Sequence, residues 1–306
     1  MERFRDFLVL RYSLVEEKQS TIDASPLPTP KGESVLVALQ SDREFSVNGV
    51  VYGLVGFSYA EPTQRHQFPV RRFLIGKVAK LRQAHVGRKV PGDIVETQED
   101  DWQPLLTIFD LHKQFIVIER DWRFGTPEQS IRALQGGLRN PIFLRYNHTI
   151  FIEGCVREEH FWKIVNTHKK IYKLDLKLIS PNILETNLKA RDALSALKDL
   201  FGQDQVNINL VNEKGDLNVP ANPIEDYVEY IQEGEGTWAI TTEGDHGGKK
   251  THTSSENIDT IMLAAPMSSS IDNTDADVSR NLISVREKDA ALVAEVFLEL
   301  SNNYER

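Results

Sequence analysis

The segment 171–179, IYKLDLKLI, alternates between apolar and polar side chains over most of its length. A period of two places the apolar side chains on one face of a strand and the polar side chains on the other. Helical patterns at 157–167 and 187–201 flank this strand, and a second alternating run follows at 206–211. Helix and strand patterns with short links predict an α+β middle part of the split-βαβ, ferredoxin-like type.

The first part of the chain is predicted to be rich in strands. Asn48-Gly49 lies between β-prone flanks and can adopt the positive φ angles of a tight turn, so we expect a hairpin there. The pattern of 71–83 fits a strand or a helix, and the acidic stretch 93–102 is predicted to be a loop. Further strands are expected at 6–12, 34–39, 104–110 and 113–120, with a turn at Leu111-His112.

The remaining elements follow from helix-start signals and apolar runs. Thr126-Pro127 predicts the start of a helix that ends near Gly136-Gly137. The other expected elements are a strand at 149–154, a helix at 224–234, strands at 237–244 and 258–264, and a helix at 285–302 that docks on the body. We expect a mobile loop at 245–257 and disorder at 267–279, and we divide the chain into domains at 1–122, 123–222 and 223–306.

Charge is divided unevenly along the chain. The formal net charge is −9, but 17 acids against six bases after position 222 give that region −11 and leave residues 1–222 near +2. Residues 62–92 hold eight bases and no acid. This asymmetry is typical of a surface for a polyanion beside a region that competes with it.

The basic patch at 62–92 predicts contact with nucleic acid. Lysines and arginines neutralise phosphates, and rings among them stack on bases; the alternative is a solvated face of the sheet. A second basic segment surrounds the link before the strand at 171–179. The residues predicted to bind phosphate are Arg65, Arg71, Arg72, Lys77, Lys80, Arg82, Arg88, Lys89, Lys169, Lys170 and Lys173.

Carboxylates at strand ends suggest an alternative function, that of a metal-dependent nuclease. Asp110, Glu119 and Asp121 have the rough spacing of a Mg²⁺ site built from hard oxygen ligands. The lysine that usually follows the glutamate is absent, since Arg120 stands there. We therefore predict no catalytic residue, no metal and no cofactor, and keep these three acids as nuclease candidates.

Two further motifs favour structural roles. The stretch 244–252, GDHGGKKTH, has Lys249 where a phosphate-binding P-loop needs glycine, so nucleotide hydrolysis is not expected. The single cysteine, Cys155, is predicted to be a buried thiol and excludes an internal disulfide. No apolar run approaches the roughly 18–20 residues that span a bilayer. With no targeting segment recognised at the start, we expect a cytoplasmic protein without membrane contact.

The segments KLDLKLISPN, VNINLVNEKGDL and YVEYIQEGEGTW carry a resemblance over residues 140–245. They resemble a group of uncharacterised bacterial and prophage proteins and, more distantly, the RexA phage-exclusion proteins. The resemblance implies a role in phage defence or exclusion, with DNA binding and self-association, and transfers no catalytic residue.

These observations predict a non-enzymatic, nucleic-acid-binding component of bacterial anti-phage defence or phage exclusion. Its phosphate contacts would be independent of sequence, with DNA favoured over RNA. We also expect a homo-oligomer or a partner protein. A second alternative to this function is a protein-interaction module that engages its partner through the acidic C-terminal region.

Overall fold

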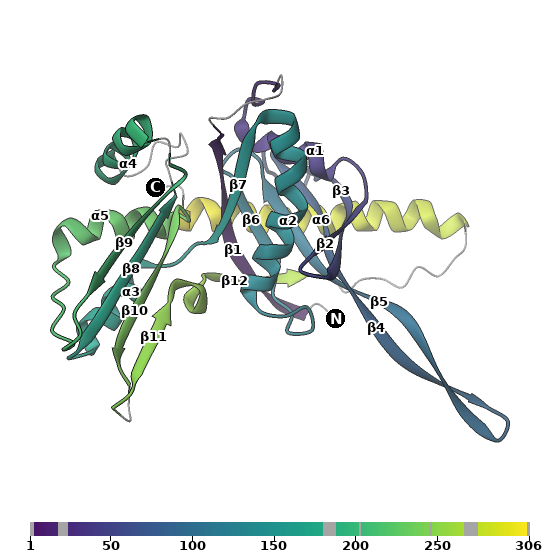
Figure 1. Cartoon of the computed structure of the whole chain (residues 1–306). Helices are drawn as coiled ribbons and strands as arrows, with labels where there is room; N and C mark the ends of the chain where they lie inside the picture. Colours follow the sequence, from purple (N-terminus) through teal and green to yellow (C-terminus); the bar gives the residue numbers. More distant parts are fainter. Residues whose placement is uncertain are drawn as a thin grey trace.

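The computed structural model describes residues 3–17, 24–179, 188–201, 203–244, 247–265 and 275–304. Within them the chain is an α+β protein with an eight-stranded and a four-stranded sheet, both antiparallel (Figure 1). The predicted α+β class is therefore confirmed. Within the described residues, none of the helices combines the length and the apolar character needed to cross a membrane.

The first sheet gathers strands from distant parts of the sequence. Its order is β12-β1-β6-β5-β4-β3-β2, and β7 pairs with the second half of β1. The predicted hairpin is confirmed, since Asn48 (φ 51°) and Gly49 (φ 79°) form the turn between β2 and β3. The strands are β1 (Arg3–Glu16), β2 (Arg43–Val47), β3 (Val50–Tyr59), β4 (Phe73–Val90), β5 (Asp93–Asp110), β6 (Phe115–Glu119), β7 (His148–Gly154) and β12 (Thr260–Ala265).

Helices cover the two faces of this sheet. On one face α2 (Pro127–Tyr146) and the short helices η1 (Lys31–Val35) and α1 (Leu36–Leu39) bury a core that includes Tyr12 and Phe109. On the other face α6 (Asp275–Tyr304) buries Val293 and Leu300 against Phe7 and Phe73. The prediction that the C-terminal helix docks on its own body is confirmed.

Helix α2 continues beyond the expected end at Gly136-Gly137. A Cβ atom at Gly136 would lie 2.4 Å from Val47, and one at Gly137 would lie 2.8 Å from Phe45. The two glycines therefore let the helix approach β2 closely instead of ending it. The helix ends at Tyr146, where Asn147 adopts a left-handed conformation with φ 55°.

Two predictions about the N-terminal part are wrong. Residues 34–39 are helical, not a strand, because Val35, Ala38 and Leu39 recur at helical spacing and all turn into the core. The acidic stretch 93–102 is the first half of β5, not a loop, because every residue from 93 onward pairs with β4. The undecided segment 71–83 proves to be mostly strand.

Strands β4 and β5 extend past the sheet as a two-stranded ribbon, which we call the arm (residues 82–101; Figure 1, lower right). Strand β3 pairs with β4 only as far as Lys80, and β6 pairs with β5 only over residues 107–110. No side chain of residues 82–100 is buried. The arm therefore contributes nothing to the hydrophobic core.

The second sheet has the order β11-β10-β8-β9 and forms its own core with helices on one face. Strands β8 and β9 are antiparallel neighbours, whereas a split βαβ unit needs parallel strands with another strand between them. The ferredoxin-like arrangement is thus not confirmed. The elements are α3 (Glu158–Thr167), β8 (Ile171–Ile179), α4 (Leu188–Phe201), β9 (Gln205–Val211), α5 (Ala221–Gln232), β10 (Gly236–Glu243), β11 (Lys249–Thr253) and η2 (Ser254–Asn257).

Two expectations for the last part also need correction. Most of the expected mobile loop at 245–257 is ordered as β11 and η2, because residues 249–253 pair with β10. Of the segment expected to be disordered, residues 275–279 belong to α6, and the rest lies outside the described residues.

The two sheets meet where β1 contacts the link between α5 and β10. The Ser13 hydroxyl donates to the buried carboxylate of Glu235 (2.9 Å), and Arg11 Nη1 donates to the Glu233 carbonyl (2.9 Å). Lys177 and Glu153 form a longer ion pair of 3.8 Å nearby. These contacts fix the upper end of the second sheet and leave its other end directed away from the first.

Candidate nucleic-acid interface

The eight bases of residues 62–92 do not converge. Five of them lie on β4, which spans about 56 Å at about 3.3 Å per residue. Alternation also divides them between faces: Lys77 lines a hollow of about 680 Å³ with Trp102, while Lys80 and Arg82 lie on the α2 side. The eight bases are therefore close in the sequence but do not form one patch on the surface.

Arg72 is buried and cannot reach a phosphate, which corrects its predicted role. Its Nε lies 3.0 Å and 2.9 Å from the two carboxylate oxygens of Asp110, and its Nη2 lies 2.6 Å from Oδ2. The guanidinium also packs over Phe73 and Phe297 at 5.2 Å and 5.0 Å. Arg72 thus joins the sheet to α6 and is part of the core.

Three further bases of residues 62–92 are less buried than Arg72 and have different contacts. Arg71 is exposed and lies over the Tyr59 ring, and the nearby Tyr59 side chain raises the pKa of Arg71. Lys80 donates to the Phe124 carbonyl at 2.7 Å, and partial burial lowers the pKa of Lys80. Arg65 is exposed in the loop before β4. Of these residues, Arg65 and Arg71 remain accessible, at the opposite end of β4 from the arm.

The arm carries more acid than base. Arg82, Arg88 and Lys89 face five acids on the opposite strand, and Arg82 lies directly across from Asp101. The net charge of −2 makes the arm a poor phosphate ligand. The predicted contacts Arg88 and Lys89 are exposed but are surrounded by carboxylates along the ribbon.

The nuclease candidates are not brought together either. Asp110 lies opposite Phe115, so Glu119 is about 13 Å further along β6 at about 3.3 Å per residue. Each carboxylate is held by an arginine: Asp110 by Arg72, and Glu119 by Arg5 at 2.6 Å. No group of three side chains suited to a metal ion occurs in the described part of the chain.

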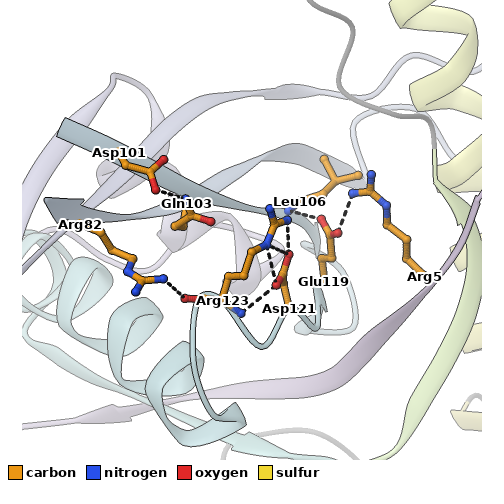
Figure 2. A network of polar contacts seen from close by, with 8 residues as sticks. All are labelled: Arg5, Arg82, Asp101, Gln103, Leu106, Glu119, Asp121 and Arg123. Atoms are coloured by element: carbon orange, nitrogen blue, oxygen red, sulfur yellow. Dashed lines mark hydrogen bonds and ion pairs between the residues drawn. The ribbon is translucent and has the colours of Figure 1, made fainter. Parts of the chain in front are cut away.

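The third candidate, Asp121, belongs to a network of polar contacts just beyond the end of β6 (Figure 2). Its carboxylate accepts the Nε and Nη2 hydrogens of Arg123 at 3.0 Å and 2.6 Å. The hydrogen bond with the Arg123 side chain is the main cause that lowers the pKa of Asp121. Arg82 Nη1 donates to the Arg123 carbonyl at 3.4 Å, which ties the base of the arm to this turn.

Basic residues do converge at the free end of the second sheet. We call Lys169, Lys170, Lys173, Lys249 and Lys250 the lysine cluster. Lys169 and Lys170 directly precede β8, Lys173 lies on it, and the start of β11 supplies the other two. Strand β10 lies between the two segments, because Thr241 pairs with Lys173 and Thr242 pairs with Lys250. Lys173 and Lys250 therefore project from opposite faces at this end of the sheet, and Lys249, opposite Glu243, shares the face of Lys173.

Ring contacts confirm that these two segments touch. The imidazoles of His168 and His252 lie 5.1 Å apart, and Lys249 Nζ lies 4.5 Å from the centre of the Tyr172 ring. Partial burial, then His168 and Lys250, lower the pKa of His252. Lys250 therefore lies close enough to His252 to disfavour a further positive charge on the imidazole.

Part of the lysine cluster is neutralised and part is available. Lys170 pairs with Glu243 at 2.9 Å, and Lys173 pairs with Asp175 at 2.8 Å. Among the described residues, Lys169, Lys249 and Lys250 have no carboxylate within ion-pair distance. Sequence reasoning marked Lys169, Lys170 and Lys173 but treated 245–257 as a loop, so it did not place Lys249 and Lys250 beside them.

Comparison of the chain with protein-family models, curated proteins and solved structures finds no match.

Proposed function

We propose that the protein is a nucleic-acid-binding component that grips the phosphate backbone through the lysine cluster. The observation that carries the proposal is the meeting of two basic segments, 168–173 and 249–252, which are remote in the sequence. Three of their lysines have no ion-pair partner among the described residues. Accessible ammonium groups on a rigid sheet end are suited to phosphates and carry no base-reading geometry.

The proposal moves the predicted contact surface from β4 to the second sheet. Lys169, Lys170 and Lys173 keep their proposed role, with Lys249 and Lys250 added. Arg72 is excluded by burial, and Arg88 and Lys89 are disfavoured by the acids of the arm. With the resemblance to phage-exclusion proteins, this surface supports a role in anti-phage defence, with DNA as the proposed ligand.

Charge reversal on the two surfaces tests the proposal with matched variants. The cluster variant carries Lys169→Glu, Lys249→Glu and Lys250→Glu, and the control carries Arg65→Glu, Arg88→Glu and Lys89→Glu. Both change the net charge equally, and all six side chains are exposed. Affinity for a labelled DNA duplex is measured by fluorescence anisotropy between about 50 and 200 mM salt.

We expect the cluster variant to lose at least about tenfold in affinity and the control to lose less than about threefold. The slope of log K against log salt should become shallower by about 0.9 for each duplex phosphate that the variant no longer neutralises. Equal decreases in both variants, or a larger decrease in the control, would overturn the assignment. Circular dichroism and thermal melting confirm that both variants are folded.

Protein interaction is a second candidate function, and the arm is the observation that favours it. Its tip exposes Ile94 at 66% and Val95 at 46%, among exposed acids. Exposed apolar side chains on a projecting ribbon suit contact with another protein. Light scattering on the wild type and on a protein without the arm tests whether the arm mediates self-association. The same number of chains per particle in both proteins argues against it.

A further inference from the structure

Trp122 is the most exposed large apolar side chain among the described residues, at 85%. It lies in the turn after β6, between Asp121 and Arg123. A single exposed apolar residue is ordinary on a protein surface. What distinguishes Trp122 is that the chain on both sides of it is held rigidly while the indole itself lies in solvent.

The turn is fixed from within by Asp121. Its Oδ1 accepts the backbone N–H of Arg123 at 2.8 Å, and the same carboxylate holds the Arg123 guanidinium with three further hydrogen bonds (Figure 2). The Asp121 carbonyl accepts the backbone N–H of Phe124 at 3.1 Å. The conformation on either side of Trp122 is therefore set before any ligand arrives, which reduces the entropy cost of binding.

The turn is also fixed from outside by β4. Phe124 is fully buried, and Lys80 Nζ donates to its carbonyl at 2.7 Å. Arg82 donates to the Arg123 carbonyl. Two bases that the sequence predicted to face a phosphate thus brace the turn that presents Trp122, although the exposed Arg82 guanidinium still contributes positive charge there.

Arginines lie in and beside the turn that holds the exposed indole, although the guanidinium of Arg123 is paired with Asp121. Arg120 precedes it and is exposed, and the side chain of Arg123 is 56% exposed beside it. No carboxylate within the described ranges lies at ion-pair distance from Arg82 or Arg120. An exposed aromatic ring with arginines beside it in the chain is suited to stack on an unpaired base while an arginine contacts the attached phosphate. A duplex offers no such base, because its bases are stacked inside.

We propose that Trp122 is a base-stacking contact, so that the protein prefers single-stranded nucleic acid. The inference rests on the proposed function, in which the lysine cluster supplies the phosphate contacts. In Figure 1 the start of α2, which follows the turn, and the start of β11 both lie toward the lower side of the view.

The test compares oligothymidylate with a duplex of equal length, using Trp122→Ala, Trp122→Leu and Trp122→Phe. Trp122→Ala should weaken single-strand binding by roughly 5- to 100-fold and duplex binding by less than about twofold. Trp122→Phe should keep most of the single-strand affinity, while Trp122→Leu should resemble Trp122→Ala, because stacking needs a ring. The strand should also quench tryptophan fluorescence in the wild type and much less in Trp122→Phe.

The outcomes separate the two proposals. If the lysine-cluster variant weakens both probes but Trp122→Ala weakens neither, the stacking contact is overturned and the proposed function stands. If the wild type binds neither probe, both are overturned. Equal weakening on both probes, or full affinity in Trp122→Leu, assigns the indole to ordinary apolar contact. A changed molar mass in Trp122→Ala with unchanged affinity for both probes assigns the indole to a protein interface. Each of the last three results overturns the inference that Trp122 stacks on a base.

Discussion

The guanidinium of Arg72 and the carboxylate of Asp110 form a buried, bidentate ion pair that links β4 to the end of β5. Asp110 Oδ1 also accepts the backbone N–H groups of His112 and Lys113 at 2.9 Å and 3.1 Å. The carboxylate therefore closes the turn into β6 as well as neutralising the arginine. A buried charge without its partner is left uncompensated in a medium of low polarity.

Asp110→Ala should destabilise the protein by about 3–5 kcal/mol, and Arg72→Ala should cost about the same or slightly less. The aspartate is expected to cost more because its removal also leaves two turn N–H groups without an acceptor. Urea unfolding followed by circular dichroism measures both. If the double variant Arg72→Met with Asp110→Leu is destabilised less than either single variant, the unpaired buried charge is the cause of the single-variant effects. A destabilisation equal to the sum of the two single-variant values would contradict that explanation.

The arm should be dispensable for folding. Replacing residues 84–99 by Asn-Gly joins Gln83 to Asp100, which already face each other as a pair, through a two-residue turn. Because no side chain of the removed segment is buried, we expect the free energy of unfolding to change by less than about 1 kcal/mol.

The same variant separates the two basic surfaces. It removes Arg88 and Lys89 together with three acids and leaves the lysine cluster unchanged. Affinity for DNA should therefore stay within about threefold of the wild type, or increase slightly as like-charge repulsion is removed. A decrease in DNA affinity of more than about tenfold would show that the arm itself contacts the phosphates.

Local signals in the sequence were sufficient where short-range chemistry decides the structure. Asn48-Gly49 specified its hairpin because positive φ angles are accessible to that pair, and IYKLDLKLI specified a strand through its period. Gly136-Gly137 misled because a glycine pair can end a helix or allow a close approach. Only the position of Phe45 and Val47 distinguishes these cases, and that position is a tertiary fact.

The candidate site was harder to predict because charge in a linear window says nothing about faces or partners. Arg71 and Arg72 are adjacent in sequence, yet one lies in solvent and the other in the core. Conversely, Lys169 and Lys249 are 80 positions apart, and β10 brings their segments together. The basic segment at 168–173 can be recognised in the sequence. That residues 249–252 lie beside it follows only from the strand pairing.

Cys155 should be unreactive in the folded protein. The side chain is fully buried, and burial raises the pKa of the thiol to about 12, with Arg11 opposing this effect. Since the thiolate is the reactive form, an aromatic disulfide reagent at pH ~8 should label the native protein very slowly and the urea-unfolded protein fully. Rapid stoichiometric labelling without denaturant would mean that the end of β7 opens readily.

His252 should make folding sensitive to acid. Its pKa in the folded protein lies below the ordinary value of 6.5, first through burial and then through His168 and Lys250, while Glu256 opposes the shift. The unfolded chain therefore takes up the proton first as pH falls. The stability contributed by the neutral histidine is present above pH ~6.5 and is lost as pH falls through the folded pKa.

The comparison that isolates this effect uses His252→Gln, which lacks the titrating group and keeps a polar partner for the Thr242 hydroxyl. Free energies of unfolding are measured in urea at pH ~8 and pH ~5, and the wild type should lose stability relative to His252→Gln on acidification. Lys250→Gln should reduce that effect, because one of the cations that disfavour the protonated imidazole is removed. A relative gain for the wild type at pH ~5 would mean that His252 is stabilised as a cation, and the positive environment assigned to the lysine cluster would be incorrect.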